Sequence, residues 1–132
     1  MPPSDDPYRY QFVFTLEDAF RVFAGLRDQP QEMAAVAFLS PERRLLGFRH
    51  LAGLDSSVTI PVRAIVRDAL AMDAALAILA HNHPGSDSTP SADDLHATQL
   101  LARGLEAVGV TLLDHLVIAQ DSTTSFVALG YL

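Results

Sequence analysis

A short apolar run that ends in two histidines constrains this chain more than any other feature. Residues 74–80 are all apolar, and no charged residue follows Asp73 in this run. A run of that length predicts a buried strand. His81 and His83 follow directly. On an extended backbone, the i, i+2 spacing puts both imidazoles on the same side of the strand. The sequence therefore predicts a pair of histidines at the end of a buried strand.

A loop and a helix start follow the histidines. Pro84, Gly85 and Pro90 break the chain, and Ser91 then opens a helical pattern with Asp94 in its first turn. Two imidazoles and one carboxylate are thus expected to converge where a strand ends and a helix begins. Three protein ligands with a fourth position left for water are the ligand set of an open catalytic zinc site.

Other interpretations of the same residues remain open at this point. Ser91-x-x-Asp94 is also a capping box, which is a purely structural device, and loop histidines are commonly surface residues. Two histidines and a carboxylate also suit Fe(II), with Asp87 in place of Asp94 in a cupin-like spacing. The helical patterns around Pro61 and after Ser91 speak against an all-β cupin. A catalytically silent interaction module is a further alternative.

Composition narrows the class of protein. At 132 residues, with 49% hydrophobic residues and a mean hydropathy of +0.20, the chain is long enough for one globular domain with a core of its own. It has no cysteine, so a disulfide or a thiolate metal site is excluded. The formal net charge of −7 repels phosphate backbones and makes nucleic acid an unlikely partner of the isolated domain.

The first residues and the apolar runs bear on localisation. No apolar run reaches the length of a bilayer span, and the proline-rich, acidic start is not a signal peptide. We therefore expect a cytoplasmic protein with no membrane partner. The oligomeric state is not determined by the sequence.

The remaining pattern predicts a mixed β-sheet with flanking helices, an α/β layered domain. Residues 1–14 form a lead-in whose alternating aromatic residues suggest a short packed strand, and residues 15–132 form a single domain. A helix is expected over 16–27 with Thr15 as its N-cap. The other expected elements are strands over 33–39 and 45–50 joined as a hairpin, a connection over 52–59, a helix that starts at Pro61, a helix from Ser91 to Gly109, and strands over 110–119 and 124–128.

Two neighbouring polar residues interrupt the strand predicted over 110–119. Asp114 and His115 need partners there, because unpaired polar groups are costly in an apolar strand. A hydrogen-bonded structural pair and a role in steadying the metal ligands are both consistent with the pattern. His50 and His96 carry no motif and are expected at the surface.

The whole constellation resembles the JAMM (MPN-plus) metalloproteases, whose signature is similar to His81-x-His83-x(7)-Ser91-x-x-Asp94. The segments AILAHNHPGSDSTPSADD, LLDHLVI and TSFVALGYL are similar, in order and spacing, to one branch of them, the RadC family. The resemblance covers residues 32–132. One departure is the order His83-Pro84-Gly85-Ser86, where the family usually has His-Pro-Ser-Gly, and it predicts a shifted left-handed position in the loop.

The resemblance implies a JAB/MPN fold, similar to that of cytidine deaminases, and a metallopeptidase or isopeptidase. Zn²⁺ would be held by His81, His83 and Asp94, and the substrate would be a peptide or protein. The glutamate that precedes the first strand of the hairpin, Glu32, matches the family's acid/base, which takes a proton from water and later protonates the leaving amine. Ser91 would donate a hydrogen bond to the oxyanion.

Two alternatives to this metallopeptidase interpretation remain open. From the residues alone, a solvated loop carboxylate is the favoured interpretation of Glu32. Glu17 and Glu42 are the other candidates for the acid/base. The RadC name also carries an association with DNA repair or recombination, so an accessory role there is the alternative function. Family analogy is weak evidence for function, and the acidic composition argues against DNA binding.

Overall fold

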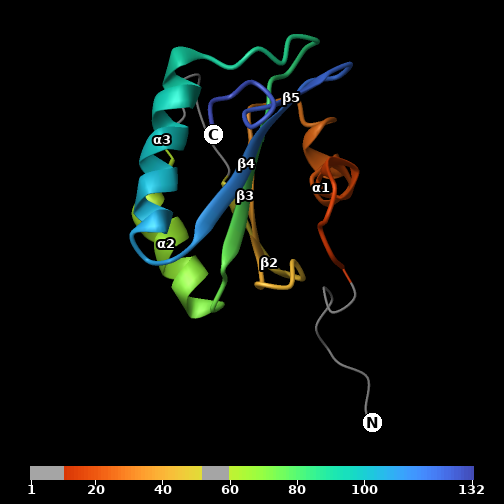
Figure 1. Ribbon diagram of the computed structural model, residues 1–132. Helices are drawn as coiled ribbons and strands as arrows, with labels where there is room; N and C mark the ends of the chain where they lie inside the picture. The colour runs from red at the N-terminus through yellow and green to blue at the C-terminus, as the bar shows by residue number, and fades with distance from the viewer. Residues whose placement is uncertain (1–10, 52–59) are drawn as a thin grey trace.

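The computed structural model describes residues 11–51 and 60–132, which form a five-stranded sheet with helices packed on it (Figure 1). The elements, in chain order, are α1 (Leu16–Val22), the 3-10 helix η1 (Ala24–Leu26), β1 (Ala34–Leu39), β2 (Leu45–Leu51), α2 (Val62–Ala71), β3 (Leu76–Asn82), α3 (Ala92–Glu106), β4 (Thr111–Ile118) and β5 (Thr123–Ser125). This confirms the predicted mixed sheet with flanking helices.

The strand order is β2-β1-β3-β4-β5. β1 pairs antiparallel with β2 and β3, and β5 pairs antiparallel with β4. β3 and β4 are parallel neighbours, and parallel neighbours need a crossover connection. α3 supplies that crossover, so its N-terminal end lies near the carboxyl end of β3 (Figure 1).

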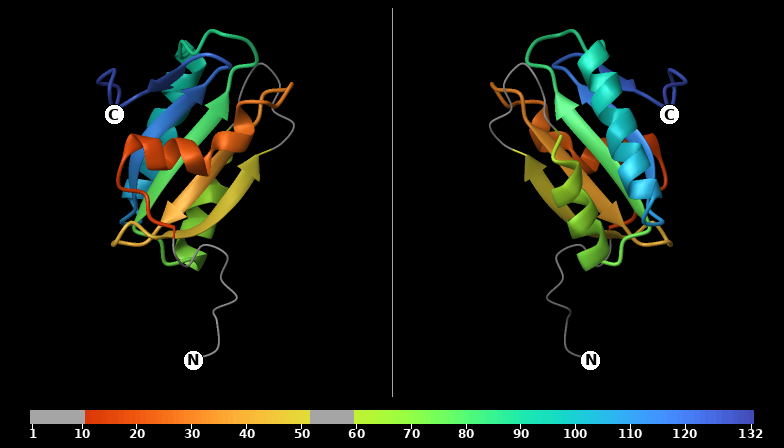
Figure 2. Two further views of the ribbon diagram at one scale, coloured as in Figure 1. Left: turned by 90° about the vertical axis from the view of Figure 1, so that its right-hand side faces the viewer. Right: turned by 90° about the vertical axis from the view of Figure 1, so that its left-hand side faces the viewer.

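Both faces of the sheet are covered, by α1 on one side and by α2 and α3 on the other (Figure 2). All six residues of β1 are buried. Val36 and Phe38 pack in one apolar cluster with Ile65 of α2, while Ala37 joins the opposite cluster with Phe23. A strand that is covered on both faces has a continuous apolar sequence instead of an alternating one.

Several elements end earlier than the sequence predicts, and the helix expected to reach Gly109 ends at Glu106. Thr15 is the N-cap of the first helix, as expected, and its Oγ1 accepts from the Asp18 amide at 3.1 Å. The α-helix ends at Val22, however, and a 3-10 turn replaces its last part. The last strand ends at Ser125 and not at residue 128, because the Val127 amide donates to the Asp114 carboxylate and leaves the strand ladder.

Within the described ranges, the lead-in residues pair with the chain at the start of β2, and Val13 is buried in the core. Phe12 forms an isolated antiparallel bridge with Arg44. The rings of Phe12 and Phe14 stack at a centroid distance of 5.9 Å and are 43% and 62% exposed. Residues 8–10 and the predicted connection over 52–59 lie outside the described residues. Among the helices that the structure describes, none is long and apolar enough to span a membrane.

The contact between α2 and α3 depends on a glycine. A Cβ atom at Gly104 would lie 2.7 Å from Cγ1 of Val62. Alanine is favoured over glycine in a helix by about 1 kcal/mol, but overpacking of this kind costs about 1–3 kcal/mol. We expect Gly104→Ala to lower the free energy of unfolding in urea, and Val62→Ala in the same chain to restore part of the loss. A single Gly104→Ala variant that is more stable than the wild type would contradict this packing.

Candidate metal centre

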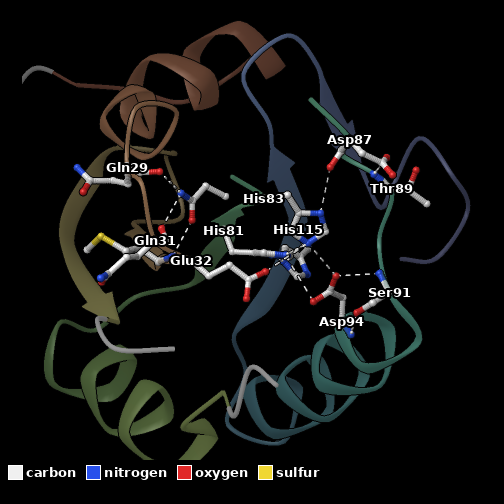
Figure 3. Close-up of polar contacts among 12 residues, drawn as sticks. Gln29, Gln31, Glu32, His81, His83, Asp87, Thr89, Ser91, Asp94 and His115 are labelled. Carbon is white, nitrogen blue, oxygen red and sulfur yellow. Dashed lines mark hydrogen bonds and ion pairs between the residues drawn. The ribbon is translucent and has the colours of Figure 1, made fainter. Parts of the chain in front are cut away.

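His81 and His83 lie on the same side of β3 and of the turn that follows it, as their spacing predicts. Their Nε2 atoms are 2.9 Å apart, and their ring centroids are 4.7 Å apart. The ring of His81 is buried, and that of His83 is partly exposed. A bound ligand would therefore be reached from the His83 side (Figure 3).

Asp94 joins the histidines from the first turn of α3. Its Oδ1 lies 3.5 Å from Nε2 of His81, and its Oδ2 lies 3.4 Å from Nε2 of His83. The ligand atoms of the three residues all lie within 4.8 Å of one another. In a tetrahedral zinc site with bonds of about 2.0–2.1 Å, neighbouring ligand atoms are about 3.3 Å apart. The observed separations of 2.9, 3.4 and 3.5 Å lie on either side of that value.

The capping box at the start of α3 also forms. Ser91 Oγ accepts from the Asp94 amide at 3.0 Å, and Asp94 Oδ2 accepts from the Ser91 amide at 2.8 Å. The structural and the ligand interpretations of Asp94 are therefore compatible, because the cap orients the carboxylate. Burial raises the pKa of the Asp94 carboxyl, but the hydrogen bond and charge of His81 and the hydrogen bonds from Ser91 outweigh it and hold the pKa well below its usual range.

The hydrogen bonds around His81 assign its proton to Nδ1. Thr98 Oγ1 donates to the carbonyl of Asp94 at 2.6 Å. Because the Thr98 hydroxyl has already donated its only proton, it must accept from Nδ1 of His115, which lies 2.5 Å from Oγ1 of Thr98. Burial, with the His81 ring beside it, lowers the pKa of His115 well below its usual range, so His115 is neutral and its Nε2 is bare. That Nε2 accepts from Nδ1 of His81 at 2.6 Å, so the neutral form of His81, the form that binds a metal, has its lone pair at Nε2.

His83 has the same arrangement. Its Nδ1 lies 3.3 Å from the carbonyl oxygen of Asp87 and donates to it, so the neutral form of His83 also has its lone pair at Nε2. Two lone pairs 2.9 Å apart, next to a carboxylate, repel one another unless a cation or a shared proton joins them. Neutral imidazole and carboxylate are ligands that zinc takes in catalytic sites. The donor set therefore fits a zinc ion.

Glu32 reaches the same centre from the residues before β1. Its Oε1 lies 3.9 Å from Nε2 of His83 (Figure 3). Of the other two candidates, Glu17 lies on α1, and Glu42 follows the far end of β1, a strand that spans about 20 Å. Asp87 is the carboxylate that would replace Asp94 in an Fe(II) site. Its Oδ1 accepts a hydrogen bond from the Thr89 amide at 2.9 Å.

The loop between the ligands has its left-handed position at Gly85, with φ of +120°. This agrees with the shift expected from the exchanged order of Gly85 and Ser86. Two hydrogen bonds join the loop to the chain after β4. The backbone N–H of Gln120 donates to the carbonyl of Gly85 at 2.7 Å, and the Ser122 hydroxyl donates to the carbonyl of Ser86 at 3.0 Å.

Asp114 and His115 divide the two roles that the sequence left open. The Asp114 carboxylate accepts from the Ser125 hydroxyl at 2.5 Å and the Val127 amide at 3.1 Å, and so anchors the C-terminal segment. The His115 ring stacks on Phe126 at 4.3 Å and contacts His81 on its other side.

Sequence reasoning missed Thr98 and Asn82. Thr98 follows Asp94 by four residues on one helix, a spacing that puts both on the same face and could have identified it. Asn82 stands between the two histidines, where alternation along the strand predicts that it faces the other way.

Known proteins match most of the chain. A family model described as a RadC-like JAB domain matches residues 14–131. The UPF0758 protein of Methylibium petroleiphilum is 44% identical over 108 residues, which are 81% of this chain and 49% of that protein. The UPF0758 protein of Pseudomonas fluorescens is 40% identical over 111 residues, with 83% and 49% covered. The chain thus spans about half the length of the curated relatives it matches, and their names state no activity.

Two histidines at the end of a central strand and a carboxylate at the start of the crossover helix, in a mixed α/β sheet, define a JAB domain with a candidate metal centre. The chain belongs to the RadC-like JAB domain family.

His115 is expected to set metal affinity through His81. His115→Phe keeps a ring against Phe126 but removes the acceptor for Nδ1 of His81. Loss of such a partner lowers metal affinity by about 10–100-fold, which competition with a chromogenic chelator for Zn²⁺ measures. His96→Phe, at an exposed position of α3, is the matched control and should leave the affinity unchanged. Equal zinc affinity of the His115 variant and the wild type would contradict this role.

Proposed function

We propose that this domain is a zinc-dependent hydrolase that cleaves an amide bond of a peptide or protein substrate. His81, His83 and Asp94 are the residues that would hold the ion. The observation that carries the proposal is the convergence of their ligand atoms within 4.8 Å, with a second carboxylate, that of Glu32, 3.9 Å from Nε2 of His83. An ion-binding cluster used only for stability would not require the additional carboxylate.

A bound zinc ion supplies Lewis acidity, which polarises a carbonyl group and lowers the pKa of water to about 7. Glu32 then acts as the general base. It is partly exposed, and its carboxylate accepts the proton from the attacking water. The same carboxyl group returns that proton to the leaving amine, so one residue serves both steps.

Ser91 is proposed to stabilise the oxyanion. Its Oγ accepts from the Asp94 amide, and an accepting hydroxyl still has its own proton to donate. The residue is exposed at the N-cap of α3, so that proton is available to a substrate. Removal of a donor of this kind costs about 10²–10³ in rate.

The test combines metal content with turnover. The zinc-loaded protein is incubated with a peptide library, and new N-termini are counted by mass spectrometry. Removal of zinc with a chelator should abolish cleavage, and Zn²⁺ should restore it. Glu32→Gln should keep the zinc and lower the rate by about 10²–10⁴-fold, the usual contribution of general acid–base catalysis.

His81→Ala should lose both the zinc and the rate, while Glu17→Gln is the matched carboxylate control and should change neither. A wild-type protein that does not bind zinc, or a Glu32→Gln variant with the full rate, would contradict the proposal.

An accessory role in DNA repair is the weaker candidate. The net charge of −7 opposes association with phosphate backbones. We expect no change in the fluorescence anisotropy of a labelled duplex at low salt when the domain is added. Binding that weakens as salt is raised would favour the DNA-associated function instead.

A further inference from the structure

Asn82 is a buried amide that binds a different part of the chain from its two histidine neighbours. It is the last residue of β3 and is 1% exposed. Its Nδ2 donates to the carbonyl of Gln29 at 3.1 Å and to that of Gln31 at 2.9 Å, and its Oδ1 accepts from the Met33 amide at 2.6 Å. Both N–H donors of the side chain are therefore used.

All of these bonds go to one short segment. Residues 27–33 connect η1 to β1 and belong to neither a helix nor a strand. The backbone turn bonds that continue from η1 end with the Gln29 amide. A fourth hydrogen bond joins the same two segments: the backbone N–H of Asn82 donates to the carbonyl of Met33 at 3.1 Å. Asn82 thus supplies the hydrogen bonds that regular structure would otherwise supply.

Glu32 lies inside the segment that Asn82 holds. The residues on either side of it, Gln31 and Met33, are both hydrogen-bonded through their backbones to the side-chain amide of Asn82. Figure 3 shows Gln29 and Gln31 on one side of the histidines, with the side chain of Glu32 extending from there towards His83. The Glu32 carboxylate and the imidazoles are therefore held in register through one residue that is covalently joined to both histidines.

We propose that Asn82 is the positioning residue for Glu32, and that it sets the distance between this carboxylate and the metal centre without being a ligand. The catalytic meaning of this role rests on the proposed hydrolase function, while the positional role does not. A displacement of about 1 Å can cost about 10²-fold in rate, so a buried clamp on both sides of the acid/base is a means of keeping that distance constant.

The positional role is tested without any substrate. Co²⁺ is loaded into the centre as a paramagnetic probe, and the relaxation of the ¹³C-labelled carboxyl carbon of Glu32 is measured by NMR. Asn82→Asp is nearly isosteric but removes both N–H donors, and we expect it to reduce the relaxation of Glu32 severalfold. The relaxation of Asp87, which is held by a different loop, should stay unchanged.

Two further variants complete this comparison. Gln31→Ala is the matched control, because it alters the same segment but leaves the backbone carbonyl that Asn82 binds, and it should behave as the wild type. Asn82→Ser also loses the amide and is the second variant if Asn82→Asp does not fold. Unchanged relaxation of Glu32 in the folded Asn82 variants overturns the proposal.

The catalytic consequence is tested by a double-mutant cycle on peptide hydrolysis. Asn82→Asp should lower the rate by about 10²-fold with unchanged zinc affinity, and it should have no further effect when Glu32→Gln is already present. An equal loss in both backgrounds means that Asn82 acts on the fold in general and overturns the role through Glu32. A wild type that binds Co²⁺ but cleaves no peptide ends the hydrolase function only, since the relaxation measurement still decides the positional role.

Discussion

The parallel pairing of β3 with β4 is the constraint on which the rest of the structure depends. Parallel strands cannot be joined by a hairpin, so α3 has to cross over the sheet and start near the carboxyl end of β3. Asp94, in the first turn of that helix, is thereby brought to the histidines. The same pairing sets Leu79 opposite His115 in register, from where the His115 ring reaches His81.

Alternation along β3 divides the work of three consecutive residues. His81 turns to the side of α3 and finds Asp94 and His115. Asn82 turns to the other side and finds the segment before β1, while His83 returns to the first side. One strand end therefore carries the two histidines and is also hydrogen-bonded to the segment that contains Glu32.

Structural and chemical roles coincide in this domain. Asp94 closes a capping box through its contacts with Ser91 and faces both imidazoles with the same carboxylate. A cap is worth about 1 kcal/mol to a helix, and it also removes the freedom of the carboxylate to turn away. The buried Thr98 and His115 extend this order outwards, because Thr98 Oγ1 donates to the Asp94 carbonyl and accepts from Nδ1 of His115.

Local patterns in the sequence were sufficient for much of the fold. The apolar run before His81, the cap at Thr15 and the helix after Ser91 were all predicted from short-range periodicity and capping chemistry, which act between neighbours in the chain. The ends of elements were less predictable. The strand after Ser122 stops early because Val127 donates to Asp114, a residue that only tertiary contact brings within reach.

The sequence by itself determined which side chains are able to bind a metal, because spacing on a strand and in a first helical turn orients them locally. The resemblance to a known family already pointed to Glu32, but only the tertiary structure decided how close Glu32 lies to His83, and that His115 and Asn82 bind different parts of the chain. Those distances depend on strand order and register, which arise from packing between segments far apart in the chain and leave no signal in any short window of residues.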